Sequence, residues 1–311
     1  MPGCRDAVVI FAPLPVLTVT IEDRSGEADI HVHAGGQGVW QSRMMSSLGV
    51  PVVLCSALGG ETGDVLGHLL PMRDVTVQTV PVSARNGAYV HDRRDGTRQV
   101  IAETAGSPLD RHELDSLYEL TLTEGLTHGR VLLSGPQDDR VVPADLYRRL
   151  STDLGANGCK VAADLAGARL EAVLAGEPDL IKVSHEELLE DGRAKSEKAA
   201  DLVKAMHAMR DEGACAVVVS RSGDAPALAL LDDDDVVEVV MPTLEPADSA
   251  GAGDSMTAGI VAALASGQPL RRALQIGAAC GALNVVRHGL GTGGGQAVET
   301  LAERVELRPW K

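Results

Sequence analysis

Short apolar runs alternate with helix-like patterns along most of this chain, and this alternation is the feature that most constrains its fold. The clearest run, residues 214–220 (ACAVVVS), is rich in β-branched residues, as in a strand that is buried on both faces. Similar runs at residues 50–58 and 161–164 are separated by stretches with helical periodicity, such as residues 110–122 and 143–154. The order predicts an α/β fold in which helices cover both faces of a mostly parallel sheet.

Two stretches break this order. Residues 16–32 and 86–102 are rich in Thr, Val and charged residues that alternate with a period of two. In the second stretch, the sequence RDGT at residues 94–97 separates two such runs, as the turn of a β-hairpin does. We therefore expect these strands to form a small accessory sheet outside the main one.

Charge and composition exclude several classes of protein. The net charge of −16 argues against a nucleic-acid partner, because such partners require a basic surface. The five cysteines form no CxxC pair, which argues against a disulfide framework or a structural zinc site. A basic leader and an apolar stretch of about 18 residues are both missing, so we expect a cytoplasmic protein without a membrane partner.

The segment DSAGAGDS, residues 248–255, is the most informative about chemistry, because it follows an apolar run and opens a helical pattern. Its glycines allow a ligand to approach the backbone closely, and the amides at a helix start bind anions. Asp254 would lie beside that anion, where a carboxylate can accept a proton from an attacking hydroxyl. The pattern indicates phosphoryl transfer; the alternative is a glycine-rich turn whose aspartate is favoured by the helix dipole.

A second glycine segment, AGGQGVWQSR at residues 34–43, also precedes a helical pattern. Glycines at a helix start again expose backbone amides, but glycine loops follow many strands. This segment therefore does not define a site by itself, and Trp40 within it either packs in the core or lies against a ligand.

Together, the two segments resemble the signatures of the PfkB family of carbohydrate kinases, which read roughly G-G-K-G-x-N and D-T-x-G-A-G-D. The resemblance is closest to the branch that contains 1-phosphofructokinase and tagatose-6-phosphate kinase, whose first signature ends in an arginine that corresponds to Arg43. It covers nearly the whole chain in order, through residues 59–64 (GGETGD), 133–136 (LSGP), 182–188 (KVSHEEL) and 284–291 (NVVRHGLG).

The resemblance implies a ribokinase-like fold: a single domain over residues 1–311 with three α/β/α layers, a mostly parallel central sheet and a small β-sheet lid. The lid strands would lie within residues 14–34 and 82–104, and the lid would exclude water from the reaction. Because the lid often forms a dimer interface in this family, the resemblance permits a homodimer through the lid, and the sequence leaves the oligomeric state open.

The resemblance also implies an ATP-dependent kinase that transfers the γ-phosphoryl group to a hydroxyl of a sugar or sugar phosphate. Asp254 would be the general base, and the GAGD segment would supply the anion hole: Gly251, Ala252 and Gly253. The implied cofactors are ATP and Mg²⁺, with a monovalent cation such as K⁺ near the anion hole. Glu187 would bind the metal, and the residues expected along the nucleotide are Ser184, Glu187, Ser220, Ser222, Gly223 and Asn284. The residues expected to contact the acceptor are Gly36, Gln37, Trp40, Arg43, Arg85 and Ser134.

The residues expected to bind the acceptor depart from the family pattern. Gln37 replaces the lysine that contacts a substrate phosphate, and Trp40 replaces an asparagine that bonds a sugar hydroxyl. Leu17 takes the position of an aspartate that binds sugar hydroxyls, and Pro136 replaces a serine. Each lost hydrogen bond to a substrate hydroxyl costs about 1–3 kcal/mol. We therefore expect an acceptor that is less polar or differently held.

Other functions remain open. A sugar phosphate stays compatible if Arg43 and Arg85 bind its phosphate. The altered acceptor half also permits a nucleotide-binding sensor or scaffold that has lost turnover, and a nucleoside kinase of the same fold is a third possibility. The presence of Asp254 favours an active kinase, because a sensor needs no base.

Overall fold

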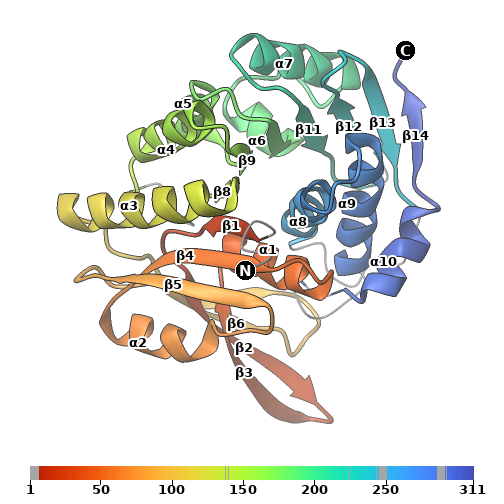
Figure 1. The fold of residues 1–311 in the computed structure, drawn as a ribbon. Coiled ribbons are helices and arrows are strands. Elements are labelled where there is room, and N and C mark those ends of the chain that lie inside the picture. Colours follow the sequence, from red (N-terminus) through yellow and green to blue (C-terminus); the bar gives the residue numbers. More distant parts are fainter. Residues whose placement is uncertain are drawn as a thin grey trace.

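The predicted alternation of strands and helices corresponds to a large twisted sheet with helices on both faces, and a smaller sheet projects from one end of it (Figure 1). The structure is a computed structural model that describes residues 7–136, 138, 140–223, 225–242, 244, 251–285, 291 and 293–311.

The main sheet has the strand order β14-β13-β12-β11-β10-β9-β8-β1-β4-β5. Neighbouring strands pair in parallel along one part of the sheet, which consists of β5, β4, β1, β8, β9, β10 and β11. The remaining strands, β12, β13 and β14, extend the sheet with antiparallel pairing. Because parallel strands end at the same edge, the loops that follow β8 to β11 meet there. The strands are β1 (Val8–Phe11), β4 (Val52–Leu58), β5 (Val75–Pro81), β8 (Arg130–Ser134), β9 (Lys160–Asp164), β10 (Leu180–Ser184), β11 (Val217–Ser220), β12 (Ala227–Leu230), β13 (Val236–Val240) and β14 (Glu306–Pro309).

Two hydrophobic layers flank this sheet, because successive residues of a strand point to opposite faces. In β1, Val8 and Ile10 pack into one layer, whereas Val9 and Phe11 pack into the other. Both layers are mainly aliphatic, as the low aromatic content requires, and the Phe11 ring meets the Tyr147 ring edge-on at 5.3 Å. None of the described helices is both long and apolar enough to span a bilayer.

The helices divide between the two layers. The first layer contains α1 (Gln37–Ser47), α2 (Gly60–Leu69), α8 (Ala252–Ala265), α9 (Leu270–Val285) and α10 (Gly295–Ala302). The second contains α3 (Arg111–His128), α4 (Ala144–Ala156), α5 (Gly167–Leu174), α6 (His185–Glu190) and α7 (Ala199–Asp211).

The smaller sheet is called the lid below, after the role expected for it. Its strands are β2 (Val16–Arg24), β3 (Glu27–Gly35), β6 (Ala88–Asp92) and β7 (Gln99–Thr104), in the order β3-β2-β6-β7. They lie in the two stretches with period-two alternation, which confirms the predicted accessory sheet. The RDGT turn joins β6 to β7, with Gly96 in the left-handed region at φ 81°.

Helices α8 and α9 approach each other closely, and glycines make this possible. A Cβ atom on Gly277 would lie 2.4 Å from Ile260 Cγ1 and 2.7 Å from the Met256 carbonyl oxygen. A Cβ atom on Gly259 would lie 2.7 Å from Cys280 Sγ. The first turn of α8 contributes to the cavity described below, so this packing also fixes one wall of that cavity.

We expect Gly277→Ala to lower the free energy of unfolding by about 1–3 kcal/mol, because overpacking forces a backbone shift. Gly67→Ala is the matched control, since a Cβ atom on this helical glycine of α2 would meet only Leu58 Cδ1, at 3.9 Å. That substitution should stabilise the protein by up to about 1 kcal/mol through helix propensity. Urea unfolding of both variants checks the expectation, and equal stabilities would contradict it.

Candidate active site

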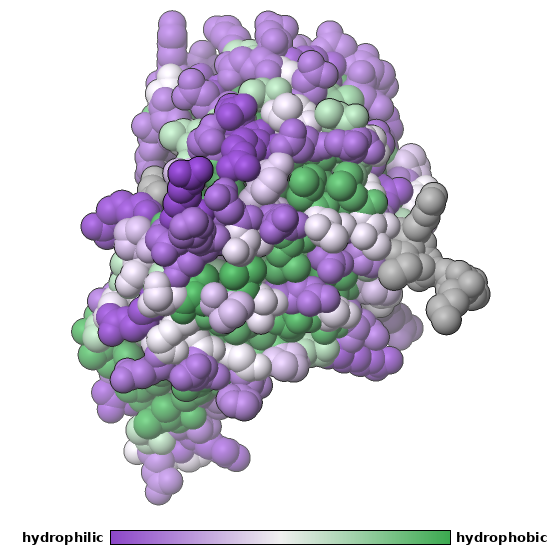
Figure 2. Space-filling model, turned by 60° about the vertical axis from the view of Figure 1, so that its left-hand side comes forward, coloured by the Kyte–Doolittle hydropathy of each residue, from purple (hydrophilic) through white to green (hydrophobic). Residues whose placement is uncertain are grey.

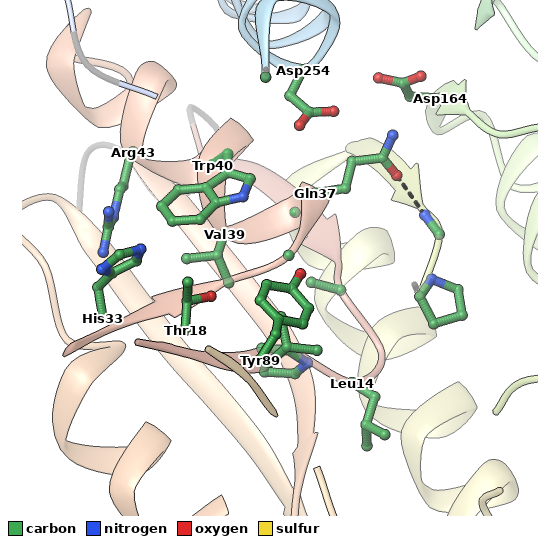
Figure 3. Close-up of a pocket in the computed structure, with 18 of the residues that line it drawn as sticks. Leu14, Thr18, His33, Gln37, Val39, Trp40, Arg43, Tyr89, Asp164 and Asp254 are labelled. Atoms are coloured by element: carbon green, nitrogen blue, oxygen red, sulfur yellow. Dashed lines mark hydrogen bonds between the residues drawn. The ribbon is translucent and has the colours of Figure 1, made fainter. Parts of the chain in front are cut away.

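A cavity of about 830 Å³ lies between the lid and the carboxyl edge of the main sheet. Its wall consists of one face of the lid, the first turns of α1 and α8, and the loops after β8 and β9 (Figure 3). The cavity therefore brings together the two glycine segments, which lie far apart in the sequence.

Asp254 lies in the first turn of α8 and faces the cavity. The helix is capped by Gly251 in the left-handed conformation, at φ 71°, and the amides of a first helical turn are available to an anion. Residues 248–250 of this segment lie outside the described residues. Burial, and then the charge of Asp164, raise the pKa of Asp254 to about 7, against the opposing charge of Lys182. Asp254 can therefore accept a proton near neutral pH.

A buried network around Asp164 lies next to Asp254. Asp164 Oδ2 accepts hydrogen bonds from Thr257 Oγ1 at 2.6 Å and from Gln41 Nε2 at 3.1 Å. Gln41 Oε1 in turn accepts a hydrogen bond from the Ser134 hydroxyl. The network thus connects α1 and α8 to the ends of β8 and β9.

Lys182, near the end of β10, neutralises part of this charge. Its Nζ atom lies 3.3 Å from Asp164 Oδ1, and both side chains are buried. The charges of Asp164, Glu187 and Asp254 outweigh the effect of burial and raise the pKa of Lys182, so it stays protonated. A Cβ atom on Gly253 would lie 2.7 Å from Nζ, which places this ammonium group directly against the glycine turn of α8.

The residues expected at the nucleotide lie along the carboxyl edge of the sheet. Ser184 caps α6 and forms a capping box with Glu187, whose Oε2 accepts a hydrogen bond from the Ser184 amide at 2.7 Å. Glu187 also lines the cavity. Ser184 and Ser220 are register partners on β10 and β11, and Ser222 and Gly223 follow β11 on the surface.

Asn284 lies apart from the cavity, near the end of α9. Its Oδ1 atom accepts a hydrogen bond from the Gly291 amide at 3.0 Å. One turn earlier, a Cβ atom on Gly281 would lie 3.1 Å from the Ala252 carbonyl oxygen, so this part of α9 packs on the start of α8. Of the closing segment, residues 286–290 lie outside the described residues.

Four of the six residues expected at the acceptor line the cavity: Gly36, Gln37, Trp40 and Arg43. Gly36 caps α1 at φ 105°, and Gln37 Oε1 accepts a hydrogen bond from the Gly135 amide at 2.7 Å. Trp40 is 7% exposed, with the Arg43 guanidinium carbon 4.7 Å from its ring centroid. The Trp40 ring is therefore packed and also forms part of the cavity wall, and its contact with a ligand stays a prediction.

The other two residues expected at the acceptor, Arg85 and Ser134, are not part of the cavity wall. Arg85 is exposed and outside the cavity wall, whereas its neighbour Asn86 is buried and bonds the Gly59 amide and the Pro15 and Ala57 carbonyls. Ser134 is fully buried, and its hydroxyl donates to Gln41 rather than facing the cavity.

The prediction for Leu17 was also wrong. Leu17 packs against the first hydrophobic layer, and the cavity wall is formed instead by Leu14, Val16 and Thr18. The alternation of β2 explains this, because residues 16 and 18 share the face that residue 17 does not.

Sequence reasoning missed several cavity residues. Asp164 ends a strand, and nothing in its local sequence distinguishes it from other strand ends. The lid also contributes side chains to the cavity wall, and the period-two pattern was the signal that could have identified them. The lid residues that line the cavity include Thr18, His31, His33, Tyr89, His91, Arg93 and Arg98. No group of three potential metal ligands occurs among the described His, Cys, Asp and Glu residues.

The chain resembles known proteins throughout most of its length. A family model described as "pfkB family carbohydrate kinase" matches residues 16–294. The chain is 27% identical over 258 residues to ATP-dependent 6-phosphofructokinase isozyme 2 of Escherichia coli, with 82% of each chain covered. It is 24% identical over 258 residues to 1-phosphofructokinase of Borreliella burgdorferi, covering 83% of this chain and 82% of that protein.

Solved structures share the fold. Phosphofructokinase-2 of Escherichia coli in complex with potassium has a TM-score of 0.82 at 24% identity, covering 96% of this chain and 98% of the other. Ribokinase of Arabidopsis thaliana, complexed with ribose and ATP, has a TM-score of 0.71 at 18% identity, covering 96% and 98%. The ribokinase-like architecture expected from the sequence is thus confirmed.

We expect Asp164→Asn to lower the pKa of Asp254 from its value of about 7, because burial persists but a neighbouring negative charge is removed while Lys182 remains. Carbon-13 NMR titration of labelled aspartate carboxyl groups, assigned with Asp254→Asn, measures this pKa. Asp191→Asn is the control, since Asp191 also lines the cavity but does not contribute to the shift. An unchanged or higher pKa in Asp164→Asn would refute the electrostatic coupling.

Proposed function

The chain belongs to the pfkB family of carbohydrate kinases, and from that premise we propose that it transfers the γ-phosphoryl group of ATP to a hydroxyl of a sugar or sugar phosphate bound under the lid. The observation that carries this proposal is Asp254, which faces the cavity from the first turn of α8 with a pKa near neutrality. A general base beside helix-terminal amides is the arrangement that phosphoryl transfer requires.

In this reaction, Asp254 accepts the proton of the acceptor hydroxyl as the hydroxyl oxygen attacks the γ-phosphorus. The amides of Ala252, Gly253 and Asp254 bind the charge that develops on the phosphoryl oxygens. Lys182, packed against Gly253, adds a fixed positive charge under the same turn. The lid keeps water, a competing acceptor, away from the phosphoryl group.

ATP fits the carboxyl edge of the sheet, beside Ser184, Ser220, Ser222, Gly223 and Asn284. Mg²⁺ usually binds through one or two carboxylates together with waters and substrate phosphates, and Glu187 in the cavity wall is suited to that role. When bound, Mg²⁺ neutralises phosphate charge in the transition state. A monovalent cation such as K⁺ near the glycine turn of α8 is part of the same proposal.

The part of the cavity wall where we expect the acceptor to bind is less polar than the residues of the family signature would make it. Leu14, Val16 and Trp40 form much of it, and the side-chain oxygen of Gln37, Oε1, accepts a hydrogen bond from the Gly135 amide. A sensor without turnover is not favoured, because Asp254 keeps the position and pKa of a base. A nucleoside acceptor is tested by including nucleosides in the substrate panel below.

We also propose a homodimer through the outer face of the lid. His31 and His33 line the cavity, so the alternating Ile30 and Val32 point outward, and these two are 62% and 47% exposed. Apolar surface gathers at the lower end of the molecule, where the lid lies (Figure 2). Exposed apolar faces of this kind mark association surfaces.

Asp254→Asn should lower kcat by about 10²–10⁴-fold, because the acceptor loses its general base. ADP release, measured against a panel of sugars, sugar phosphates and nucleosides, checks this. The wild-type rate should also fall as the pH decreases below about 7, because protonated Asp254 cannot accept a proton. Undiminished turnover by Asp254→Asn would show that another group is the base, and calorimetric binding of ATP to this variant controls for misfolding.

Ile30→Glu should convert the dimer to a monomer by placing a charge in the apolar lid interface. Light scattering after size exclusion measures the mass, which is 32.4 kDa for one chain. Leu126→Glu, at an exposed leucine of α3, a helix that packs on α4 and on the main sheet, should leave the dimer intact. A monomeric wild-type protein would eliminate the proposed interface.

A further inference from the structure

We propose that Gln37 is a positioning residue, which holds the Asp254 carboxylate by a hydrogen bond from its side-chain amide and fixes where the base meets the acceptor hydroxyl. The inference rests on the proposed function and deepens it, because the base of that reaction needs a fixed orientation as well as a suitable charge. It also changes the role of a residue that was expected, from its place in a glycine segment, to contact the acceptor.

The orientation of the Gln37 amide is determined by the loop after β8. Its Oε1 atom accepts a hydrogen bond from the Gly135 amide at 2.7 Å, and a backbone N–H group can only donate. The oxygen of the side chain must therefore face Gly135, which turns the donor atom, Nε2, to the other side. Figure 3 shows that Asp254 and Asp164 lie on that side.

The donor group of Gln37 meets the base. Asp254 has a side-chain hydrogen bond with Gln37 that favours the ionised carboxylate. Gln37 lies in the first turn of α1 and Asp254 in the first turn of α8, so this bond joins the starts of the two glycine-led helices. An aspartate side chain can adopt several rotamers, and a donor fixed on a neighbouring helix selects one of them. The contact therefore gives the base a defined direction in the cavity.

Gln41, one turn later on α1, makes the same pair of contacts. Its Oε1 atom accepts a hydrogen bond from the Ser134 hydroxyl, and its Nε2 atom donates to Asp164 Oδ2 at 3.1 Å. Residues four apart lie on one face of a helix, so both glutamines connect this face of α1 to the end of β8 and to a carboxylate. Gln41 is fully buried, so its contacts hold the protein together rather than a ligand. The repetition supports the same kind of role for Gln37.

The charges around Asp254 give this hydrogen bond a measurable effect. Burial, and then the charge of Asp164, raise the pKa of Asp254 to about 7, and Glu187 adds to this, whereas Lys182 and the hydrogen bond from Gln37 oppose it. A hydrogen bond to the ionised form of an acid favours that form. Gln37 therefore keeps a larger share of the base ionised at neutral pH without adding a charge to the cavity.

The first test measures the pKa of Asp254 by carbon-13 NMR, in protein without ATP or acceptor. Gln37→Met should raise this pKa, because the ionised carboxylate loses a donor, and Gln37→Lys should lower it, because an ammonium group then lies beside the carboxylate. An unchanged pKa in both variants would overturn the inference. A shift in the same direction in both would also overturn it, because it would report a displaced loop and not a contact with Asp254.

Two further variants control for the loop. Gln37→Glu keeps an oxygen atom for the Gly135 amide but places a carboxylate beside Asp254, so the pKa of Asp254 should rise although the loop is held. Gln99→Met is the matched control, since Gln99 is an exposed glutamine of β7 that donates to Asp95 Oδ2 at 2.9 Å. It removes the same kind of bond outside the cavity wall and should leave the pKa of Asp254 unchanged. A lower pKa in Gln37→Glu would contradict the proposed contact.

Kinetics then distinguish a positioning residue from a contact of the acceptor. With the acceptor that gives the fastest ADP release in the panel, Gln37→Met should lower kcat by about 10- to 100-fold, because the base is no longer held in place. The acid limb of its pH–rate profile should move to higher pH, and the KM for the acceptor should stay nearly constant. A raised KM at unchanged kcat would show that Gln37 binds the acceptor, and would overturn the inference.

The two proposals can fail separately. The NMR titrations need no turnover, so they decide the role of Gln37 in every case. An absence of ADP release with every acceptor would contradict the proposed function alone.

Discussion

The buried ion pair between Asp164 and Lys182 is the interaction on which the cavity depends. Moving each charge out of water costs several kcal/mol, and an ion pair offsets this only with additional hydrogen bonds. Thr257 and Gln41 supply those bonds from α8 and α1. The contacts that satisfy one buried carboxylate therefore also hold both glycine-led helices against the sheet.

Much of the fold could be predicted because its signals are local. Strand periodicity defined both sheets, and glycines before helical patterns marked the helix starts that carry Asp254, Gln37 and Trp40. The incorrect predictions of cavity residues arose at positions where a shift of one residue along the sequence changes which way a side chain faces. Leu17 and Arg85 each lie next to a residue that faces inward, and a shift of one position in an extended segment reverses the face of every side chain.

The network around Asp164 could not be predicted in the same way. Gln41 and Asp164 are 123 positions apart, and Thr257 lies 93 positions beyond Asp164. Gln41 lies in the second glycine segment, but Asp164 and Thr257 lie in neither segment, and the three side chains meet only at the carboxyl edge of the folded sheet. Contacts between residues so far apart in the sequence depend on the topology of the whole fold, so no local sequence pattern predicts them.

The pKa of Asp254, near 7, also bears on how the product leaves the cavity. On the proposed reaction, the substrate arrives with its hydroxyl among carboxylates, and the product leaves with a new dianionic ester at that position. At this point Asp254 has taken up the proton of the hydroxyl and is neutral. Once it releases that proton, its carboxylate repels the ester, because two negative charges then lie close together in a buried site. Loss of the proton thereby favours departure of the product and returns the base to its active form.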